Sequence, residues 1–278
     1  MESNNNKNQE RIYKVGESCV FRKTKELFGG LSNMASGFPI KINGINILTS
    51  EALYQACRFP HMQDVQKKIC LEKSPMSAKM VSKPFRPQSR TDWDNVRVDI
   101  MYWCLKVKLA QNFISFGQLL ETTFDKPIVE DSSKDSFWGA IKDKENEFVL
   151  KGTNALGRLL MKLRQEYNSE RRYELLYVEP LTIPDFLFYG EPIPVIDERH
   201  NFIESLYKFW GIKPKAEKQD NKYIEQIEKK IFEKPAMVTE PEVEFNTNQK
   251  ETTNKSKSKK SKKKSQNVEM YSLFDNLP

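Results

Sequence analysis

The chain has 278 residues, 38% of them hydrophobic, which is enough to bury a substantial core. Its formal net charge at pH 7 is +7, but residues 255–264 (KSKSKKSKKK) hold seven lysines and no acid, so the rest of the chain is formally neutral. Sequence-independent affinity for nucleic-acid phosphates is therefore expected from this tail and not from the folded part.

Several functional classes find no support in the sequence. The chain has no run of about 18 apolar residues and no apolar segment after its polar start, which predicts a soluble cytoplasmic protein without a membrane partner. Four cysteines without CxxC spacing and only two histidines predict free thiols and no metal site. The absence of a phosphate-loop lysine motif and of GxGxxG argues against kinases and dehydrogenases, so no cofactor is expected.

The first structured segment is expected at Ile12–Phe21, as one or two strands. A glycine pair follows, Gly29 and Gly30, with Ser32 and Asn33 directly after it. Glycine adopts positive φ and allows close approach of the backbone, and short polar side chains form hydrogen bonds locally. These residues predict a loop that can hold a polar ligand.

The next segment is predicted to be a hairpin followed by a helix. Asn43-Gly44 stands between two apolar runs and is the dipeptide that best fits a type I′ turn. Thr49 or Ser50 can then cap a helix whose first turn carries Glu51.

Further along the chain, helices outnumber strands. Ser74 before Pro75 reads as an N-cap followed by proline at the first helical position, and Thr91 and Asp94 have capping-box spacing at the start of a long amphipathic helix. That helix is expected to end near Asn112. The other expected helices are His61–Leu71, Pro75–Val81, Phe116–Thr123, Ala155–Tyr167, Asp197–Trp210 and Asn221–Glu233, with a strand at Ile128–Glu130 and loops at 82–90 and 134–140.

These elements predict an α+β fold, a mainly helical domain with a small antiparallel sheet. The expected organisation is a disordered N-terminus (1–10), a main folded domain (11–170), a C-terminal extension (171–234) and a disordered basic tail (235–278). Within the extension, residues 171–214 are rich in prolines and aromatic residues, which fits either a packed appendage or a partner-binding arm.

Six motifs occur in a set order between residues 20 and 167: GGLSNMA, TSEALYQACRF, SPMSAKM, a tryptophan that opens a long helix, KDSFWG and GTNALGRLLMKLR. Together they resemble the NADAR family of YbiA-like N-glycosidases. The form SEALYQACRFPH is most similar to NADAR proteins that accompany DarT-type toxins and remove ADP-ribose from guanine in DNA. The resemblance implies an ADP-ribosyl glycohydrolase with an antitoxin role and a DarT-type toxin as functional partner.

Two other functions stay open. One is hydrolysis of phosphoribosylated intermediates of the riboflavin pathway, as in the YbiA branch. The other is a non-catalytic module that binds ADP-ribose. In the DNA case the substrate base has to be single-stranded or flipped out, because a base inside a duplex is inaccessible.

Cleavage of a ribosyl N-glycosidic bond requires a carboxylate near the anomeric carbon and an acid or base for the leaving group. The family motif implies Glu51 as that carboxylate, although an acid in a first helical turn more often stabilises the helix dipole. Asp135 is the candidate second carboxylate, or a turn residue. Lys79 is the candidate for a Schiff base with the opened ribose, because Arg58 stands where the YbiA branch has lysine and a guanidinium cannot supply a neutral amine.

The resemblance also implies a set of substrate contacts. Trp93 and Trp138 are expected as pocket walls, or as core residues. Asn154 is a ligand contact or a helix cap. The two phosphates of ADP-ribose would meet Arg58, Lys79 or amides of the glycine loop. The full set of predicted substrate-binding residues is Gly29, Gly30, Ser32, Asn33, Tyr54, Gln55, Arg58, Trp93, Trp138, Gly139 and Asn154.

The chain ends in an apolar cluster, EMYSLFDNLP. Met270–Phe274 within it is similar to the QLSLF-type peptide by which bacterial DNA-maintenance proteins dock on the replication sliding clamp, with methionine where that pattern has glutamine. The alternative is a chance grouping of apolar residues.

Overall fold

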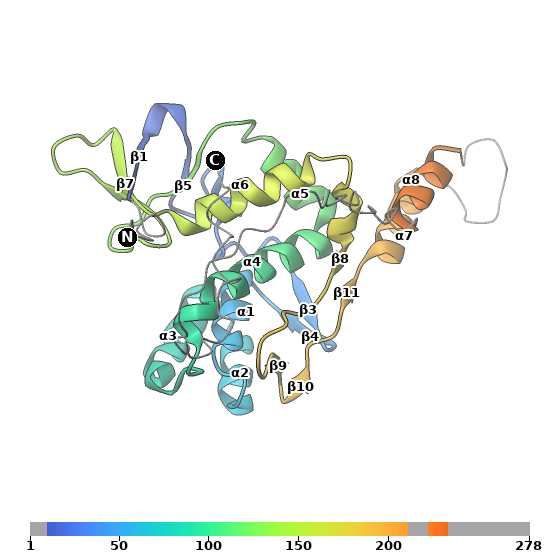
Figure 1. Ribbon diagram of the computed structural model, residues 1–278, viewed down its shortest axis with the longest axis horizontal. Helices are drawn as coiled ribbons and strands as arrows, with labels where there is room; N and C mark the ends of the chain where they lie inside the picture. Colours follow the sequence, from blue (N-terminus) through green and yellow to red (C-terminus); the bar gives the residue numbers. More distant parts are fainter. Residues whose placement is uncertain (1–9, 211–221, 233–278) are drawn as a thin grey trace, which may run out of the picture.

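The long helix α4 (Trp93–Gln111) lies at the centre of the fold and contacts elements from both halves of the chain. In the computed structural model, which describes residues 10–210 and 222–232, α1 to α3 lie on one side of α4 and α5 and α6 on the other (Figure 1). The predicted N-terminal and C-terminal disorder and the Met270–Phe274 motif concern residues that lie almost entirely outside the described ranges.

Helix α4 is central because its apolar residues cover more than one face. Trp103 is fully buried, and so are Ile100, Cys104, Leu105 and Val107, so the helix is enclosed by neighbours. The predicted capping box does not form at its start. The N-cap is Asp92, without a side-chain cap bond, and its carboxylate instead accepts hydrogen bonds from Arg90.

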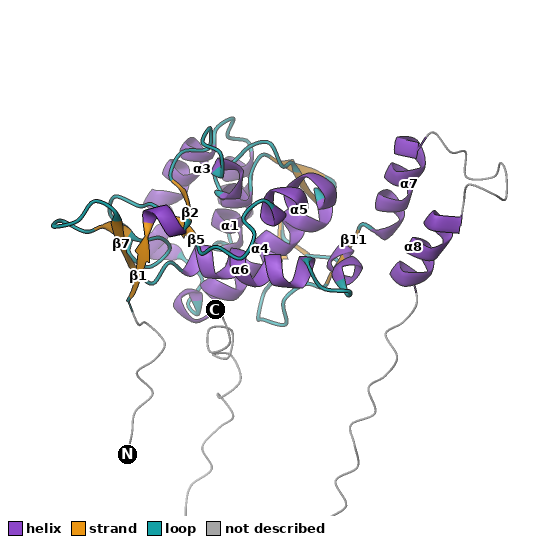
Figure 2. Cartoon of the chain, turned by 90° about the horizontal axis from the view of Figure 1, so that it is seen from above, coloured by secondary structure: helices purple, strands orange, loops and turns teal. Residues whose placement is uncertain are grey.

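The strands form several small pairings. Figure 2 shows β1 and β7 at one end of the molecule, where β1 (Arg11–Lys14), β7 (Val149–Gly152) and β6 (Ile141–Lys142) make an antiparallel sheet. The strands β2 (Cys19–Phe21) and β5 (Ile128–Glu130) pair in parallel, a pairing that the sequence did not indicate. The α+β prediction with a small antiparallel sheet is confirmed.

The predicted hairpin is confirmed. Strands β3 (Ile40–Ile42) and β4 (Ile45–Ile47) pair antiparallel, with Ile42 opposite Ile45. Asn43 and Gly44 both have positive φ, 49° and 78°, as a type I′ turn requires.

Helices α1 and α3 begin at caps that the sequence predicted. Thr49 caps α1 by accepting a hydrogen bond from the Ala52 amide, and Ser74 caps α3 in the same way from Ser77. Residues 83–88, expected as part of a loop, form a 3-10 helix. The remaining helices are α1 (Ser50–Cys57), α2 (Gln63–Cys70), α3 (Pro75–Ser82), α5 (Phe113–Glu121), α6 (Ala155–Tyr167), α7 (Arg199–Trp210) and α8 (Lys222–Phe232), with 3-10 helices at Val15–Glu17, Gly29–Leu31, Lys83–Gln88 and Arg172–Leu176. None of these described helices is long and apolar enough to cross a membrane.

Much of the C-terminal extension packs on the core. The indole of Trp103 donates to the Glu179 carbonyl at 3.0 Å, and the Phe186 ring lies 4.9 Å from it. The buried amide of Gln66 donates to the Leu187 carbonyl and accepts from the Tyr189 amide. This part of the extension is therefore a packed appendage. Its short strands are β8 (Tyr177–Val178), β9 (Leu187–Phe188), β10 (Glu191–Pro192) and β11 (Ile196–Asp197).

The loop after β2 is held by a buried lysine of α4. The Lys108 ammonium donates to the carbonyls of Gly30 and Ser32, at 2.7 and 3.2 Å, and lies over the rings of Phe38 and Phe116. Because burial withdraws the amine from water, the pKa of Lys108 falls to about 7.

Replacement of Lys108 by methionine tests this interaction. The variant leaves two buried carbonyls without a donor, so a loss of about 2–5 kcal/mol in the free energy of unfolding is expected in denaturant titrations. Between the folded pKa near 7 and the unfolded pKa of about 10.4, the unfolded chain binds more protons. The stability of the parent should therefore rise with pH over that range, and the variant should lack this rise. Lys106→Met, two residues earlier in α4, is the matched control; an equal loss there would contradict the assignment.

Candidate active site

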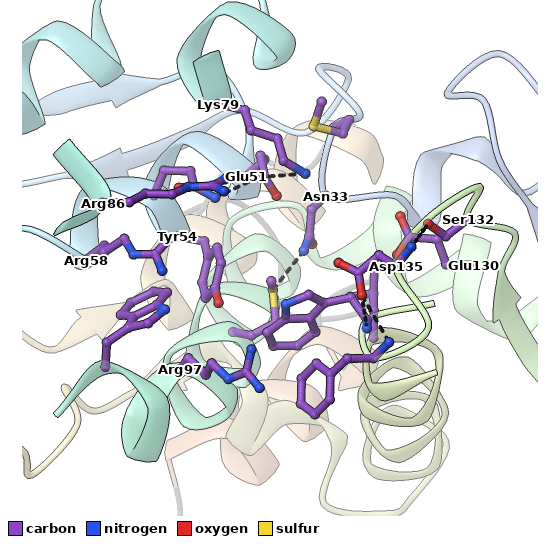
Figure 3. Close-up of a pocket in the computed structure, with 17 residues that line it drawn as sticks. Asn33, Glu51, Tyr54, Arg58, Lys79, Arg86, Arg97, Glu130, Ser132 and Asp135 are labelled. Atoms are coloured by element: carbon purple, nitrogen blue, oxygen red, sulfur yellow. Dashed lines mark hydrogen bonds and ion pairs between the residues drawn. The ribbon is translucent and has the colours of Figure 1, made fainter. Parts of the chain in front are cut away.

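A pocket of about 360 Å³ opens where α1, α3, the start of α4 and the segment after β5 meet (Figure 3). It brings together most of the predicted site residues, from parts of the chain far apart in sequence. Its lining consists of Asn33, Met34, Glu51, Tyr54, Gln55, Arg58, Lys79, Arg86, Trp93, Arg97, Met101, Glu130, Ser132, Asp135, Phe137, Trp138 and Leu156.

Glu51 is fixed at the start of α1 by its backbone and its carboxylate. The Glu51 amide donates to the Asn33 carbonyl at 3.0 Å, which satisfies one of the free amides of the first helical turn. Its Oε1 accepts a hydrogen bond from Gln55 Nε2 at 3.0 Å and lies 3.9 Å from Lys79 Nζ. The Glu51 side chain is only 9% exposed, whereas that of Lys79 is 46% exposed. Glu51 therefore presents a nearly buried carboxylate to the pocket.

The orientation of Gln55 is fixed in turn by a second contact. Ser82 at the end of α3 donates to Gln55 Oε1 at 2.9 Å, so the Gln55 amide nitrogen is left to face Glu51. This relay connects α3 to the carboxylate through two side chains.

Three aromatic residues, Tyr54, Trp93 and Trp138, form what we term the aromatic wall. The Tyr54 ring centroid lies 5.1 Å from that of Trp93 and 5.7 Å from that of Trp138. Burial raises the pKa of the Tyr54 phenol well above its usual value, so the phenol stays neutral. Tyr54 and Trp93 are nearly buried, 4% and 6% exposed, whereas Trp138 is partly buried and offers the larger flat surface for stacking with a base.

Cations border the same pocket. The Arg58 guanidinium lies 4.4 Å from the Trp93 ring centroid and donates to Ser89 Oγ. Burial lowers the pKa of Arg58, though an arginine keeps its charge at neutral pH. Arg97 lies 4.1 Å from the Phe137 ring centroid, and Arg86 also lines the pocket.

Arg86 and Arg97 are absent from the predicted site. Arg97 stands one helical turn after Trp93, so its position on the same face of α4 was readable from the spacing. Arg86 belongs to the segment expected as a loop, and nothing in the local sequence singled it out.

Asp135 lines the pocket, but its carboxylate has a role in the backbone of its loop. Its Oδ1 accepts hydrogen bonds from the amides of Phe137 and Trp138, at 3.0 and 2.9 Å. The carbonyls of residues 136–139 then accept the amides of residues 153–156, so this loop caps the start of α6. These contacts favour a structural role for Asp135, and its catalytic assignment stays a prediction.

Five predicted contact residues lie outside the pocket lining. The glycine pair has no positive φ, in contrast to our expectation; it forms a 3-10 turn that packs tightly, since a Cβ at Gly30 would lie 2.6 Å from the Leu119 side chain. The Ser32 carbonyl accepts a hydrogen bond from the Lys108 ammonium. Gly139 packs on β5, where a Cβ would lie 2.5 Å from the Glu130 carbonyl oxygen.

Asn154 is the fifth of these residues. It has left-handed backbone, φ 50° and ψ 47°, at the N-cap of α6, but its side chain does not cap the helix. Instead its Oδ1 accepts from the Glu130 amide and its Nδ2 donates to the Ile128 carbonyl. Asn154 therefore holds strand β5.

The sequence did not indicate Glu130, the last residue of β5. This side chain lines the pocket, and burial, together with the nearby charge of Glu51, raises its pKa to about 7. The available signal was a carboxylate at the end of an otherwise apolar strand, directly before the DSSKD segment (131–135).

Comparisons with known proteins show which proteins this chain resembles. The chain is 31% identical over 164 residues to N-glycosidase YbiA of Escherichia coli (strain K12), which covers 58% of this chain and 97% of that protein. It is 36% identical over 160 residues to the riboflavin biosynthesis protein PYRR, chloroplastic, of Zea mays, covering 52% of this chain and 24% of the relative. A riboflavin biosynthesis protein of Vibrio vulnificus is 31% identical over 181 residues, with 63% and 46% covered.

The chain thus spans less than half the length of the maize and Vibrio relatives. Among solved structures, the NMR structure of Escherichia coli YbiA matches with 29% identity and a TM-score of 0.45, covering 54% of this chain and 84% of that one. The family model of the NADAR domain matches residues 20–168, which is more than half of the 278 residues and includes every residue of the pocket lining. The chain therefore belongs to the NADAR family.

Proposed function

We propose that this chain is an N-glycosidase that removes ADP-ribose from guanine bases of DNA and so reverses the modification made by a DarT-type toxin. The observation that carries the proposal is the Glu51 carboxylate, held by Gln55 and Lys79 in a pocket that also has an aromatic wall and several cations. The name of the YbiA relative, N-glycosidase, supports the reaction type.

The reaction places positive charge on the anomeric carbon as the bond to the base breaks. A fixed carboxylate in a site with little water stabilises that charge without first having to reorganise. Glu51 meets this requirement because its backbone is fixed by Asn33 and its side chain by Gln55. Its second carboxylate oxygen has no hydrogen-bond partner in the described part of the chain, and it is the atom we assign to face the sugar.

Recognition of an ADP-ribosylated base needs flat surface and positive charge. The aromatic wall supplies a stacking surface for a base that is single-stranded or flipped out. Arg58, Arg86 and Arg97 supply guanidinium groups, which suit the oxygen atoms of a diphosphate.

Lys79 has two roles compatible with its position. Its ammonium lies 3.9 Å from Glu51 and is partly exposed, so it can balance the carboxylate or contact a phosphate. A Schiff base with the opened ribose requires the neutral amine, and this step stays a prediction.

The central test is incubation with an oligonucleotide that carries ADP-ribosylated guanine. The parent should release ADP-ribose and restore the plain oligonucleotide. Glu51→Gln keeps the size of the side chain but removes the charge, so kcat should fall by about 10²–10³-fold, the size typical for the loss of one electrostatic stabiliser. Chromatography of both products gives the rates.

Glu147→Gln, at an exposed position far along the chain, is the matched control and should retain full activity. Thermal unfolding and ADP-ribose binding of Glu51→Gln should equal those of the parent. A Glu51→Gln protein with parental kcat would remove Glu51 from the mechanism.

A second candidate function is hydrolysis of phosphoribosylated intermediates of the riboflavin pathway. It is favoured by the names of the maize and Vibrio relatives, both riboflavin biosynthesis proteins. The two substrates differ in size and charge. DNA can bind the seven clustered lysines of residues 255–264 through its phosphates, whereas a small metabolite does not require them.

Deletion of residues 236–278 separates the two candidates. On modified oligonucleotides, loss of the lysines should lower kcat/KM at low salt and flatten its salt dependence, because each phosphate contact contributes a log–log slope of about −0.7 on single strands. On a small phosphoribosylated substrate kcat/KM should not change. Equal activity of both forms on DNA at every salt concentration would shift the assignment to the metabolite.

A further inference from the structure

Glu130 lies in the same pocket as Glu51 but comes from a different part of the chain, the end of strand β5. In Figure 3, Glu51 and Lys79 lie on one side of the pocket, and Glu130 lies on the other with Ser132 and Asp135. We propose that Glu130 is the catalytic acid that donates a proton to the leaving nitrogen of the base. The inference rests on the proposed N-glycosidase function and assigns the residue that acts on the leaving group.

The backbone of Glu130 is fixed from three directions. Glu130 lies opposite Phe21 of β2 in the strand pairing. Its carbonyl accepts a hydrogen bond from the Ala140 amide at 2.8 Å, and its amide donates to Asn154 Oδ1 at 3.2 Å. Asn154 reaches this position because its backbone is left-handed, a conformation that asparagine tolerates better than most residues. The structure thus holds β5 rigidly at the point where Glu130 enters the pocket.

The carboxyl group of Glu130 differs from the other two carboxyl groups of the pocket in its contacts. It has no hydrogen-bond or ion-pair partner among the residues that the structure describes, although it lines the pocket. The other two carboxylates have partners: Glu51 contacts Gln55 and Lys79, and Asp135 accepts two backbone amides. Of the three, Glu130 is the one whose proton is available for transfer.

The surroundings also favour the protonated form. Burial is the main cause of the raised pKa of about 7, and the negative charges of Glu51 on α1 and Asp135 on the adjacent loop raise it further, whereas Lys79 on α3 lowers it. A carboxyl group with this pKa can give up a proton and recover it near neutral pH. Two carboxyl groups held in different environments are the usual arrangement for separate acid and electrostatic roles.

The proposed step balances as follows. The bond between the anomeric carbon and the base nitrogen breaks, its electron pair stays on nitrogen, and the Glu130 proton moves to that nitrogen. The cationic sugar forms beside the Glu51 carboxylate. A water oxygen then bonds to the anomeric carbon and passes a proton to the Glu130 carboxylate, which restores the acid. One water is consumed, and no redox partner is needed.

The test uses the full-length protein, the modified oligonucleotide and Glu130→Gln. The variant should bind ADP-ribose in calorimetry with a Kd within about threefold of the parent, while kcat falls by about 10²–10⁴-fold, the usual contribution of a general acid. In the parent, kcat should fall as pH rises above about 7, because the acid loses its proton there. Glu130→Gln should lack this alkaline decline.

Glu147→Gln, at an exposed position outside the pocket, is the matched control; it should keep kcat near the parental value and retain the alkaline decline. If Glu130→Gln does not fold, Glu130→Asp keeps a carboxyl group of slightly lower intrinsic pKa and should move the alkaline decline to lower pH. A Glu130→Gln protein with parental kcat and an unchanged decline overturns the proposal, as does an unshifted decline in Glu130→Asp.

The outcome also distinguishes the two proposals. A parent that hydrolyses only the phosphoribosylated metabolite refutes the DNA assignment, and the Glu130 comparison is then decided on that substrate. A parent that hydrolyses neither overturns both.

Discussion

The hydrogen bond from the Glu51 amide to the Asn33 carbonyl is the contact on which the site depends, because it ties the start of α1 to the loop after β2. Asn33 is placed by the preceding turn, whose carbonyls are held by the buried Lys108. A cation enclosed by carbonyl oxygens and two phenyl rings is costly to bury, and its cost is offset only while the turn keeps its shape. The Glu51 carboxylate is therefore positioned by a polar group deep in the core.

The pocket treats its three carboxyl groups differently. Glu51 is paired with an amide and an ammonium, Asp135 is engaged by backbone amides, and Glu130 has neither kind of partner in the described structure. The same chemical group thus serves as electrostatic stabiliser, loop organiser and proton donor in our proposal. The division follows from local hydrogen bonding, burial and neighbouring charges, which is how enzymes separate the roles of like side chains.

Features with local signals were predictable. The Asn43-Gly44 turn, the caps at Thr49 and Ser74 and the bounds of α6 follow from a few neighbouring residues, and the structure confirms them. Glu130 was not predictable in this way, because its raised pKa depends on burial and on the charge of Glu51. Both act on Glu130 only once β5 packs against segments distant in the sequence. The prediction of positive φ at the glycine pair was wrong for a related reason: Gly29 packs so tightly on the backbone of Lys23 and Thr24 that a Cβ has no room there, whatever its φ.

The packed part of the C-terminal extension, which lies beyond the family match, contributes to the hydrophobic core. The NADAR match ends at residue 168, yet Phe186 and Phe188 complete the hydrophobic core, the former against the Trp103 ring. A chain that stopped at the domain boundary would expose that tryptophan and leave Gln66 without two of its partners. The boundary of the family match and the boundary of the hydrophobic core therefore do not coincide in this chain.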